Sequence, residues 1–453
     1  MGSGKAPAAP PRVGAGPPPI PRKASAAETG RSGPPAAPPD SHRAGRGESP
    51  TTARRGAAGA KATEPPVPPN PPRIRPKPIR PAEFVWAFPP EPPFEDEARP
   101  LLHAPAVDAQ GRVFLHHGDR LVALEPRDEG PKVLWEYVTG CHVPGPVALA
   151  PDGSLRLHGT DGSVHAVSDS GRQVWSPVHV GEPLGYATPS IDAAGNTYIS
   201  SKDGGLHRID ADGRLAKPAP WFRTRQQLNA GSIIRDGVLY VGSEDGYLFA
   251  IALGGARGEN LFDHALERGH AGWYIHSRPA LAADGTILLA GSDEHLYGFA
   301  PDGRTLWRTR LAGLMLGSPV VDRQGHIYIG VSLFQRGQQP RGWLVSIDGN
   351  SHKVRWEYPA RDAVESTPAI GDDDVIYFGD NAGVIHAVDC RGQMRWTAQV
   401  EAAARSSLVI IAPERLAVGL DDQTLVVLRC SSQSLATEGW PKAAKTLAQN
   451  GLA

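Results

Sequence analysis

The sequence predicts an all-β fold, an eight-bladed β-propeller of four-stranded antiparallel blades, preceded by a disordered proline-rich tail. A unit of about 43 residues recurs eight times, and each copy holds four short β-rich runs separated by turn residues. A unit of this size accommodates one four-stranded blade. The chain has 52 Gly and 45 Pro among 453 residues, a turn content that excludes a coiled coil or a plain helical bundle.

Residues 1–80 form the tail. They hold 20 of the 45 prolines, no Phe, Trp or Tyr, and 14 Lys and Arg against 4 Asp and Glu. Such a segment cannot bury enough apolar surface to offset the entropy lost on ordering, so we expect a disordered basic spacer. Within it, PPRIRPKPIRP (71–81) has the proline spacing of ligands for aromatic-lined grooves. Weak electrostatic contact with nucleic acid, or with the acidic remainder of the chain, is a further possibility.

Neither a leader nor a membrane span is expected. The first residues lack the apolar run of a secretory signal, no cysteine precedes Cys141, and no stretch approaches 18 consecutive apolar residues. We therefore expect a cytoplasmic protein, or a periplasmic one if the true start lies upstream. Cys141, Cys390 and Cys430 are expected to be small buried apolar residues in a reducing compartment.

The repeat is aligned on runs of the type I-Y-x-G. The intervals between successive copies are 42, 42, 42, 48, 40, 49 and 40 residues. Equivalent positions in the eight units are Phe114, Arg156, Tyr198, Tyr240, Leu288, Tyr328, Tyr377 and Ala417.

The unit at 368–396 shows the full pattern. Pro368 opens a first strand, VIYFG forms the second, VIHAVD the third, and the fourth ends at Trp396. Alternating and β-branched residues fit half-buried strands of an antiparallel meander. Acidic turns such as DAQG (108–111), DAAG (192–195), DADG (210–213) and Asp372 to Asp374 recur where a hairpin is needed, so we interpret them as turns and not as calcium loops.

These motifs, an opening Pro, I-Y-x-G-S-x-D-G, L-x-A-h-D and h-x-W, resemble the quinoprotein-like, or pyrroloquinoline-quinone-like, β-propeller repeat family over residues 86–440. The family includes a propeller lipoprotein of outer-membrane protein assembly, whose lipid-anchored cysteine has no counterpart near the start of this sequence. We divide the chain into a tail at 1–80, a propeller at 81–440 and a C-terminal extension at 441–453.

The resemblance implies that an aromatic residue ending each blade packs between neighbouring sheets. The third unit offers Leu215 or Trp221 for this place. For the eighth, we expect residues 83–88 to complete the blade begun by 404–430 with Trp86, while Trp440 is the alternative. The expected docking residues are Trp86, Trp135, Trp175, Phe262, Trp307, Trp356 and Trp396.

Family enzymes carry a quinone, a calcium ion and a disulfide between adjacent cysteines. This sequence has no adjacent cysteine pair and no C-x-x-C-H haem motif. Neighbouring His116 and His117 should point to opposite faces of a strand, so they should not share a metal ion. We expect surface or inter-blade histidines, no cofactor, no metal and no catalysis.

Two insertions interrupt the repeat and are candidate partner surfaces, because additions to a regular scaffold fall on loops. They lie at 332–343 and 254–277. Their aromatic and arginine residues are of types enriched at binding hot spots, namely Phe334, Arg336, Arg341, Trp343, Trp273 and Tyr274.

We therefore expect a non-catalytic, monomeric protein-interaction scaffold whose protein partner the sequence does not name. Two alternatives stay open: an oxidoreductase that depends on pyrroloquinoline quinone, and a propeller that senses a small ligand or carbohydrate. No membrane span and no specific nucleic-acid partner are expected.

Overall fold

The computed structural model describes residues 83–89, 103–181, 187–265 and 275–442. All of them lie in one compact unit, Arg73–Ala453. The expected tail at 1–80 and most of the extension at 441–453 lie outside the described residues. The described residues form 32 strands and no helix, so none of them belongs to a helix that could cross a membrane.

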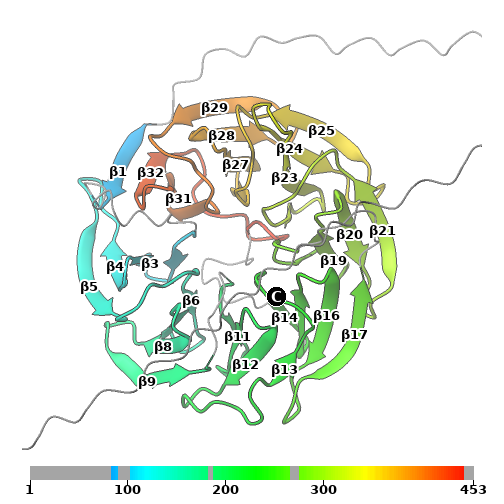
Figure 1. The fold of residues 1–453 in the computed structure, drawn as a ribbon. Helices are drawn as coiled ribbons and strands as arrows, with labels where there is room; N and C mark the ends of the chain where they lie inside the picture. The colour runs from blue at the N-terminus through cyan, green and yellow to red at the C-terminus, as the bar shows by residue number, and fades with distance from the viewer. Residues whose placement is uncertain (1–82, 90–102, 182–186, 266–274, 443–453) are drawn as a thin grey trace, which may run out of the picture. The chain divides into compact units, whose positions relative to one another are not determined.

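The strands form eight four-stranded antiparallel sheets, which follow one another around a ring (Figure 1). We call them blades 1 to 8. Blade 1 comprises β2 (Ala106–Val107), β3 (Val113–His117), β4 (Arg120–Glu125) and β5 (Lys132–Val138). Blade 2 comprises β6 (Ala148–Leu149), β7 (Leu155–His158), β8 (Ser163–Val167) and β9 (Gln173–His179). Blade 3 comprises β10 (Ser190–Ile191), β11 (Thr197–Ser200), β12 (Gly205–Ile209) and β13 (Phe222–Arg223). Blade 4 comprises β14 (Ile233–Arg235), β15 (Val238–Gly242), β16 (Tyr247–Ala252) and β17 (Glu259–Ala265).

The second half of the ring repeats the arrangement. Blade 5 comprises β18 (Ala280–Leu281), β19 (Ile287–Ala290), β20 (His295–Phe299) and β21 (Thr305–Arg310). Blade 6 comprises β22 (Val320–Val321), β23 (Ile327–Leu333), β24 (Arg341–Ile347) and β25 (Val354–Pro359). Blade 7 comprises β26 (Ala369–Ile370), β27 (Val375–Gly379), β28 (Val384–Asp389) and β29 (Met394–Gln399). Blade 8 comprises β30 (Val409–Ala412), β31 (Arg415–Gly419), β32 (Leu425–Arg429) and β1 (Phe84–Phe88). The predicted eight-bladed propeller is therefore confirmed.

Blade 8 is built from both ends of the propeller sequence. β1 pairs antiparallel with β32, with Trp86 opposite Val427, and the amide of Arg429 donates to the carbonyl oxygen of Glu83 at 2.7 Å. The prediction that residues 83–88 complete the last blade is confirmed. The alternative, Trp440 in the last slot, is wrong, because Trp440 pairs with Val321 of blade 6. Closure covers the outer edge of β32, which would otherwise present unpaired amides and carbonyls.

The alternation of side chains explains why these residues form blades. The middle strands are buried on both faces, as in β27, whereas the outer strand β25 alternates half-buried and exposed residues. Asp389 shows the turn chemistry: its Oδ1 accepts from the amides of Arg391 and Gln393, both at 2.9 Å, and Gly392 has a φ of 79°. The acidic turns at Asp108, Asp192 and Asp210 bind their own backbone amides in the same way.

In five blades the aligned repeat residue contacts an aromatic residue across the sheet. The aligned residue lies on the second strand, and the aromatic lies on the fourth strand or, in blade 3, just before it. Ring centroids are 5.9 Å apart for Phe114 and Trp135, 5.5 Å for Tyr198 and Trp221, 6.3 Å for Tyr240 and Phe262, 5.8 Å for Tyr328 and Trp356, and 5.7 Å for Tyr377 and Trp396. Blade 3 therefore uses Trp221, and Leu215 packs beside Trp175 instead.

Several of these aromatics also rest on the following blade. Trp135 Nε1 donates to the carbonyl oxygen of Asp169 at 2.9 Å, and Trp356 Nε1 donates to that of Cys390 at 3.1 Å. Trp307 stacks on His352 with ring centroids 4.3 Å apart. Each of four aromatics also packs against a turn glycine of the next blade, where a side chain would not fit. A Cβ atom added to the glycine would lie 2.6–2.8 Å from the aromatic ring system in the pairs Gly171 with Trp135, Gly213 with Trp175, Gly303 with Phe262 and Gly392 with Trp356.

A buried polar chain also joins blades 6 and 7. Tyr358 Oη and His386 Nδ1 share a hydrogen bond of 3.3 Å, and His386 Nε2 donates to Asp380 Oδ2 at 3.1 Å. Burial opposes ionisation of Asp380, but hydrogen bonds from His386 and from the amides of Val384 and Arg361 outweigh it, so the pKa of Asp380 lies below its ordinary 3.8. Ionised Asp380 therefore stabilises the fold above the pKa of the unfolded chain.

We predict that Asp380→Asn lowers the free energy of unfolding at pH 7 by about 1–3 kcal/mol, because charge-assisted hydrogen bonds are lost in a buried site. The difference between the two proteins should shrink as pH falls below about 4 and through the folded pKa, since the wild-type carboxyl then takes up a proton. Urea unfolding at several pH values measures it. Asp302→Asn, in an exposed turn, is the control and should change stability less at every pH. If the difference in free energy of unfolding between the two proteins stayed constant down to pH 3, the ionised state of Asp380 would not be the source of the stabilisation.

Candidate functional site

One face of the ring carries the candidate site. In an antiparallel meander, the connection into each first strand and the loop between the second and third strands lie at the same end of the blade. We call this end the channel face. Residues just before the first strands of all eight blades line a cavity of about 470 Å³ there, which falls in the range of ligand pockets.

The longest hairpin of the ring belongs to the channel face. β23 and β24 have seven residues each, whereas the second strands of the other blades have four or five. The predicted insertion at 332–343 forms this extension and the loop at its tip. The sequence placed it between the second and third strands of the sixth unit, where the structure has it.

The four candidate contact residues of the hairpin differ in exposure. Phe334 is 46% exposed, although it is a large apolar residue, and Arg336 and Arg341 are also exposed. Neither arginine forms an ion pair with another described residue. Trp343 is half-buried and packs against the apolar cluster that spans blades 4, 5 and 6. It therefore anchors the hairpin, while Phe334, Arg336 and Arg341 are free to contact a partner.

The second insertion is only partly described. Glu259–Ala265 of the predicted loop is the fourth strand of blade 4, so less of it is loop than the sequence suggested. Trp273 and Tyr274 lie outside the described residues.

Histidines gather at the edge of the cavity. His103 lines it, and the ring centroid of His116 lies 5.7 Å from that of His103 and 6.3 Å from that of His142. His116 is buried and not at the surface. Burial lowers the pKa of His103 to about 4, so its ring is neutral at pH 7. Among residues 83–89, 103–181, 187–265 and 275–442, no three His, Cys, Asp or Glu side chains are arranged to hold a metal ion.

The cavity does not fit a quinone held by calcium. Calcium takes about six to eight oxygen ligands, mostly carboxylates and carbonyls. Glu365 is the one carboxylate of the described lining, and it accepts a hydrogen bond from Asn381 at 2.7 Å and faces Arg405 at 3.7 Å. The lining is instead rich in basic side chains, with Arg278, Arg405 and two histidines.

The three cysteines lie apart from this cavity and are free. Cys430 is buried, and Cys141 and Cys390 are half-buried. Burial raises the pKa of the Cys141 thiol, and it raises that of Cys430 to about 11. Both thiols are therefore protonated at neutral pH and are poor nucleophiles.

Sequence reasoning missed the basic residues of the cavity. A signal was present at the position before the opening proline of each unit, where blades 3, 6 and 7 have Thr188, Ser318 and Thr367 but blade 5 has Arg278. Lys442, which is buried beyond the last repeat and is not among the residues that line the cavity, had no such signal.

Comparison with solved structures agrees with the fold. BamB from Moraxella catarrhalis superposes with a TM-score of 0.59 and 16% identity, covering 77% of this chain and 100% of that one. A europium-containing methanol dehydrogenase gives 0.60 and 11%, covering 77% and 93%. Sqt1 of Saccharomyces cerevisiae gives 0.62 and 15%, covering 78% and 100%. Identities this low show the fold alone. No curated protein matches the sequence.

The family comparison is more specific. The model of one family, described as outer membrane protein assembly factor BamB, matches residues 83–261, 252–408 and 292–438. These matches together span all eight blades and more than half of the chain. The chain therefore belongs to the pyrroloquinoline-quinone-like β-propeller family described as outer membrane protein assembly factor BamB.

Proposed function

We propose that the protein is a non-catalytic β-propeller that binds a protein partner through its channel face, with the β23–β24 hairpin as a main contact. The observation that carries this proposal is the extended hairpin itself, with Phe334 46% exposed at the end of an otherwise regular scaffold. An exposed aromatic residue beside arginines that form no ion pair within the described part of the chain has the composition of an interface hot spot. Membership in a family named for an assembly factor supports the same role.

The arrangement suits binding more than chemistry. The described thiols Cys141 and Cys430 are protonated, His103 at the cavity is neutral, and the one carboxylate of the described lining is tied to Arg405 and Asn381. We also propose the cytoplasm as the compartment, on the ground that three free cysteines persist best where thiols stay reduced. Fractionation of cells that carry the protein tests the compartment.

We predict that the double variant Phe334→Ser with Arg336→Glu loses a partner that the wild type retains. Truncation of central hot-spot residues weakens binding by about 2 kcal/mol or more, roughly thirtyfold. Proteins captured from cells by the wild type, the double variant and Leu306→Ser are compared by quantitative mass spectrometry. Leu306 is a matched control, because it is 48% exposed on the outer strand β21, away from the channel face.

A partner that Leu306→Ser keeps and the hairpin variant loses would support the proposal, and its affinity for the purified proteins then gives the fold-change. Equal capture by all three proteins would overturn the assignment to the hairpin. The same capture experiment with a chain that lacks residues 1–80 identifies the partners that bind the tail, because only those partners are lost. Dye reduction over a panel of alcohols and sugars, with pyrroloquinoline quinone and calcium added, tests the alternative, and robust turnover would overturn a non-catalytic role.

A further inference from the structure

Two basic side chains are buried near the cavity, and one of them, Arg278, lines it. Arg278 lines the cavity just before the first strand of blade 5 and is 5% exposed. Lys442 is 0% exposed, and its Nζ has no hydrogen-bond partner among the described residues. Both residues are tied to the same part of blade 6: Trp440, two residues before Lys442, pairs with Val321, and the amide of Arg278 donates to Ser318 Oγ.

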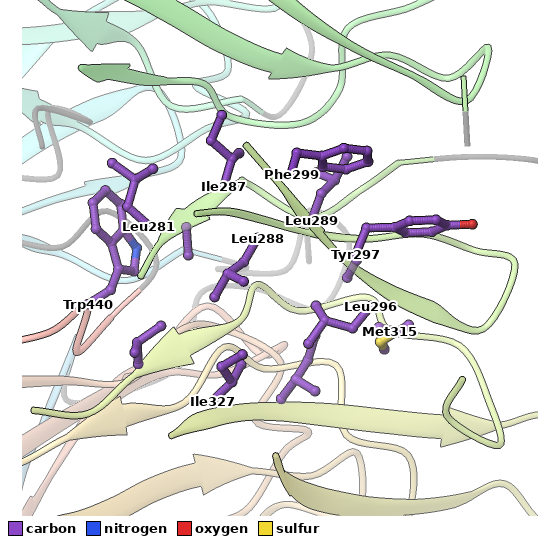
Figure 2. Close-up of a cluster of buried hydrophobic side chains, with 14 of the residues drawn as sticks. Leu281, Ile287, Leu288, Leu289, Leu296, Tyr297, Phe299, Met315, Ile327 and Trp440 are labelled. Atoms are coloured by element: carbon purple, nitrogen blue, oxygen red, sulfur yellow. The ribbon is translucent and has the colours of Figure 1, made fainter. Parts of the chain in front are cut away.

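The C-terminal segment brings Lys442 to this place. After β32 the chain runs inside the ring along the first strands of blades 7 and 6 (Figure 1), and Trp440 exchanges backbone hydrogen bonds of 2.7 and 2.8 Å with Val321 of blade 6. The amide of Ile370 in blade 7 donates to the carbonyl oxygen of Pro441 at 2.9 Å. The indole of Trp440 lies beside Leu281 of blade 5 in the apolar core (Figure 2). Both neighbours of Lys442 on its N-terminal side are therefore fixed.

The backbone and the guanidinium of Arg278 are also fixed in position. Its amide donates to Ser318 Oγ of blade 6 at 2.9 Å, and its guanidinium lies directly against Gly231 of blade 4, where any Cβ atom would fall on the side chain. The one hydrogen bond of the guanidinium among described residues is a long one, 3.5 Å from Nη2 to the carbonyl oxygen of Thr188. Most of its donors are thus left for the cavity.

No carboxylate among the described residues neutralises either cation. Arg405, on the same cavity, shows the contrast, because it pairs with Asp421 at 2.7 Å and with Glu365 at 3.7 Å. Burying an unpaired charge is costly, and it commonly lowers the pKa of a lysine instead. Burial and the charge of Arg278 lower the pKa of Lys442 to about 7, and burial lowers that of Arg278 to about 10. Hydrophobic residues of similar size would cost the fold less.

We propose that Arg278 and Lys442 form a binding site for a small oxyanion, a phosphate or a carboxylate, inside the central channel. A guanidinium presents parallel N–H groups that match two oxygens of either group, and an ammonium adds a point charge. The cavity of about 470 Å³ that Arg278 lines has room for the molecule that carries the oxyanion. The site would bind its ion whether or not the β23–β24 hairpin docks a partner.

The test uses thermal unfolding and titration calorimetry of the full chain with sulfate, phosphate, acetate and succinate, each compared with chloride at equal ionic strength. We expect at least one oxyanion to raise the unfolding temperature of the wild type and to bind as a single site. Lys442→Met and Gly231→Ala should each weaken that binding about tenfold or more, the first by removing a charge and the second by displacing the guanidinium. Lys353→Met, at an exposed outer turn, has the same charge change and should leave binding intact.

Stability separates a ligand site from a structural one. In chloride alone, Lys442→Met should unfold at a higher temperature than the wild type, because it removes an uncompensated buried charge. The two proteins should converge or reverse order when the oxyanion is added. A response to sulfate and phosphate only assigns a phosphate-bearing ligand, and a response to acetate or succinate only assigns a carboxylate. The proposal is overturned if no oxyanion acts differently from chloride, or if all variants respond like the wild type. A less stable Lys442→Met that is indifferent to every oxyanion would also overturn it, because the chain itself would then supply the counter-charge.

Discussion

Trp86→Ala is expected to lower the free energy of unfolding by about 3–5 kcal/mol, the usual effect of emptying a buried aromatic site. Trp86 is 5% exposed and belongs to an apolar cluster that joins both ends of the ring, with Val427 of blade 8 and with Val113 and Leu115 of blade 1. Removing the indole weakens blade 8, the blade in which the fourth strand comes from the other end of the propeller sequence and is not joined to the third strand by a hairpin. Urea unfolding followed by tryptophan fluorescence and by circular dichroism measures it.

Phe84→Ala on the same strand is the control. Phe84 is 59% exposed, so its truncation should change stability by no more than about 0.5 kcal/mol. Deleting residues 83–89 altogether should do more than either substitution, because it uncovers β32 as an unpaired edge and invites association between copies. Size-exclusion chromatography would then show oligomers. Similar stabilities for Trp86→Ala and Phe84→Ala would contradict the role of Trp86 in closure.

Much of the ring could be predicted because the same residue types recur at the same strand positions of successive blades. The aligned aromatics at Tyr328 and Tyr377, and the tryptophans that follow them, mark the second and fourth strands of each blade, and the structure brings each pair within 6 Å. The assignment of blade 8 to β1 succeeds for the same reason, since the flanks of Trp86 look like other fourth strands. The sequence does not decide between Leu215 and Trp221 in blade 3, because the fourth strand there is only two residues long.

The channel could not be predicted in the same way. Lys442 reaches Arg278 only because Trp440 pairs with Val321, a contact between residues more than a hundred positions apart in a segment with no repeat. Period and composition describe what every blade shares, whereas a binding site depends on what one blade has and the others lack. The hairpin of blade 6 was found because an insertion breaks the period visibly. The substitution of one residue before an opening proline, as at Arg278, does not break it.

Gly392→Ala is expected to be among the most destabilising single methyl additions in the ring, at about 3 kcal/mol. Two costs combine. Gly392 has a φ of 79°, which costs an alanine about 1–2 kcal/mol. The new Cβ atom would also lie 2.8 Å from Cδ2 of Trp356, so the indole must move away from the turn and from its hydrogen bond to the carbonyl oxygen of Cys390.

Gly153→Ala separates these two costs, because Gly153 has the same φ of 79° but its added Cβ atom would meet no other atom within 4 Å. It should therefore show only the backbone cost, and the difference between the two variants, about 1–2 kcal/mol, measures the contact of Trp356 with blade 7. In a Trp356→Ala background that difference should disappear, since the indole that the methyl group displaces is gone. If Gly392→Ala and Gly153→Ala destabilise the protein equally, the indole is not pressed against the turn, and the blades are held together by other contacts.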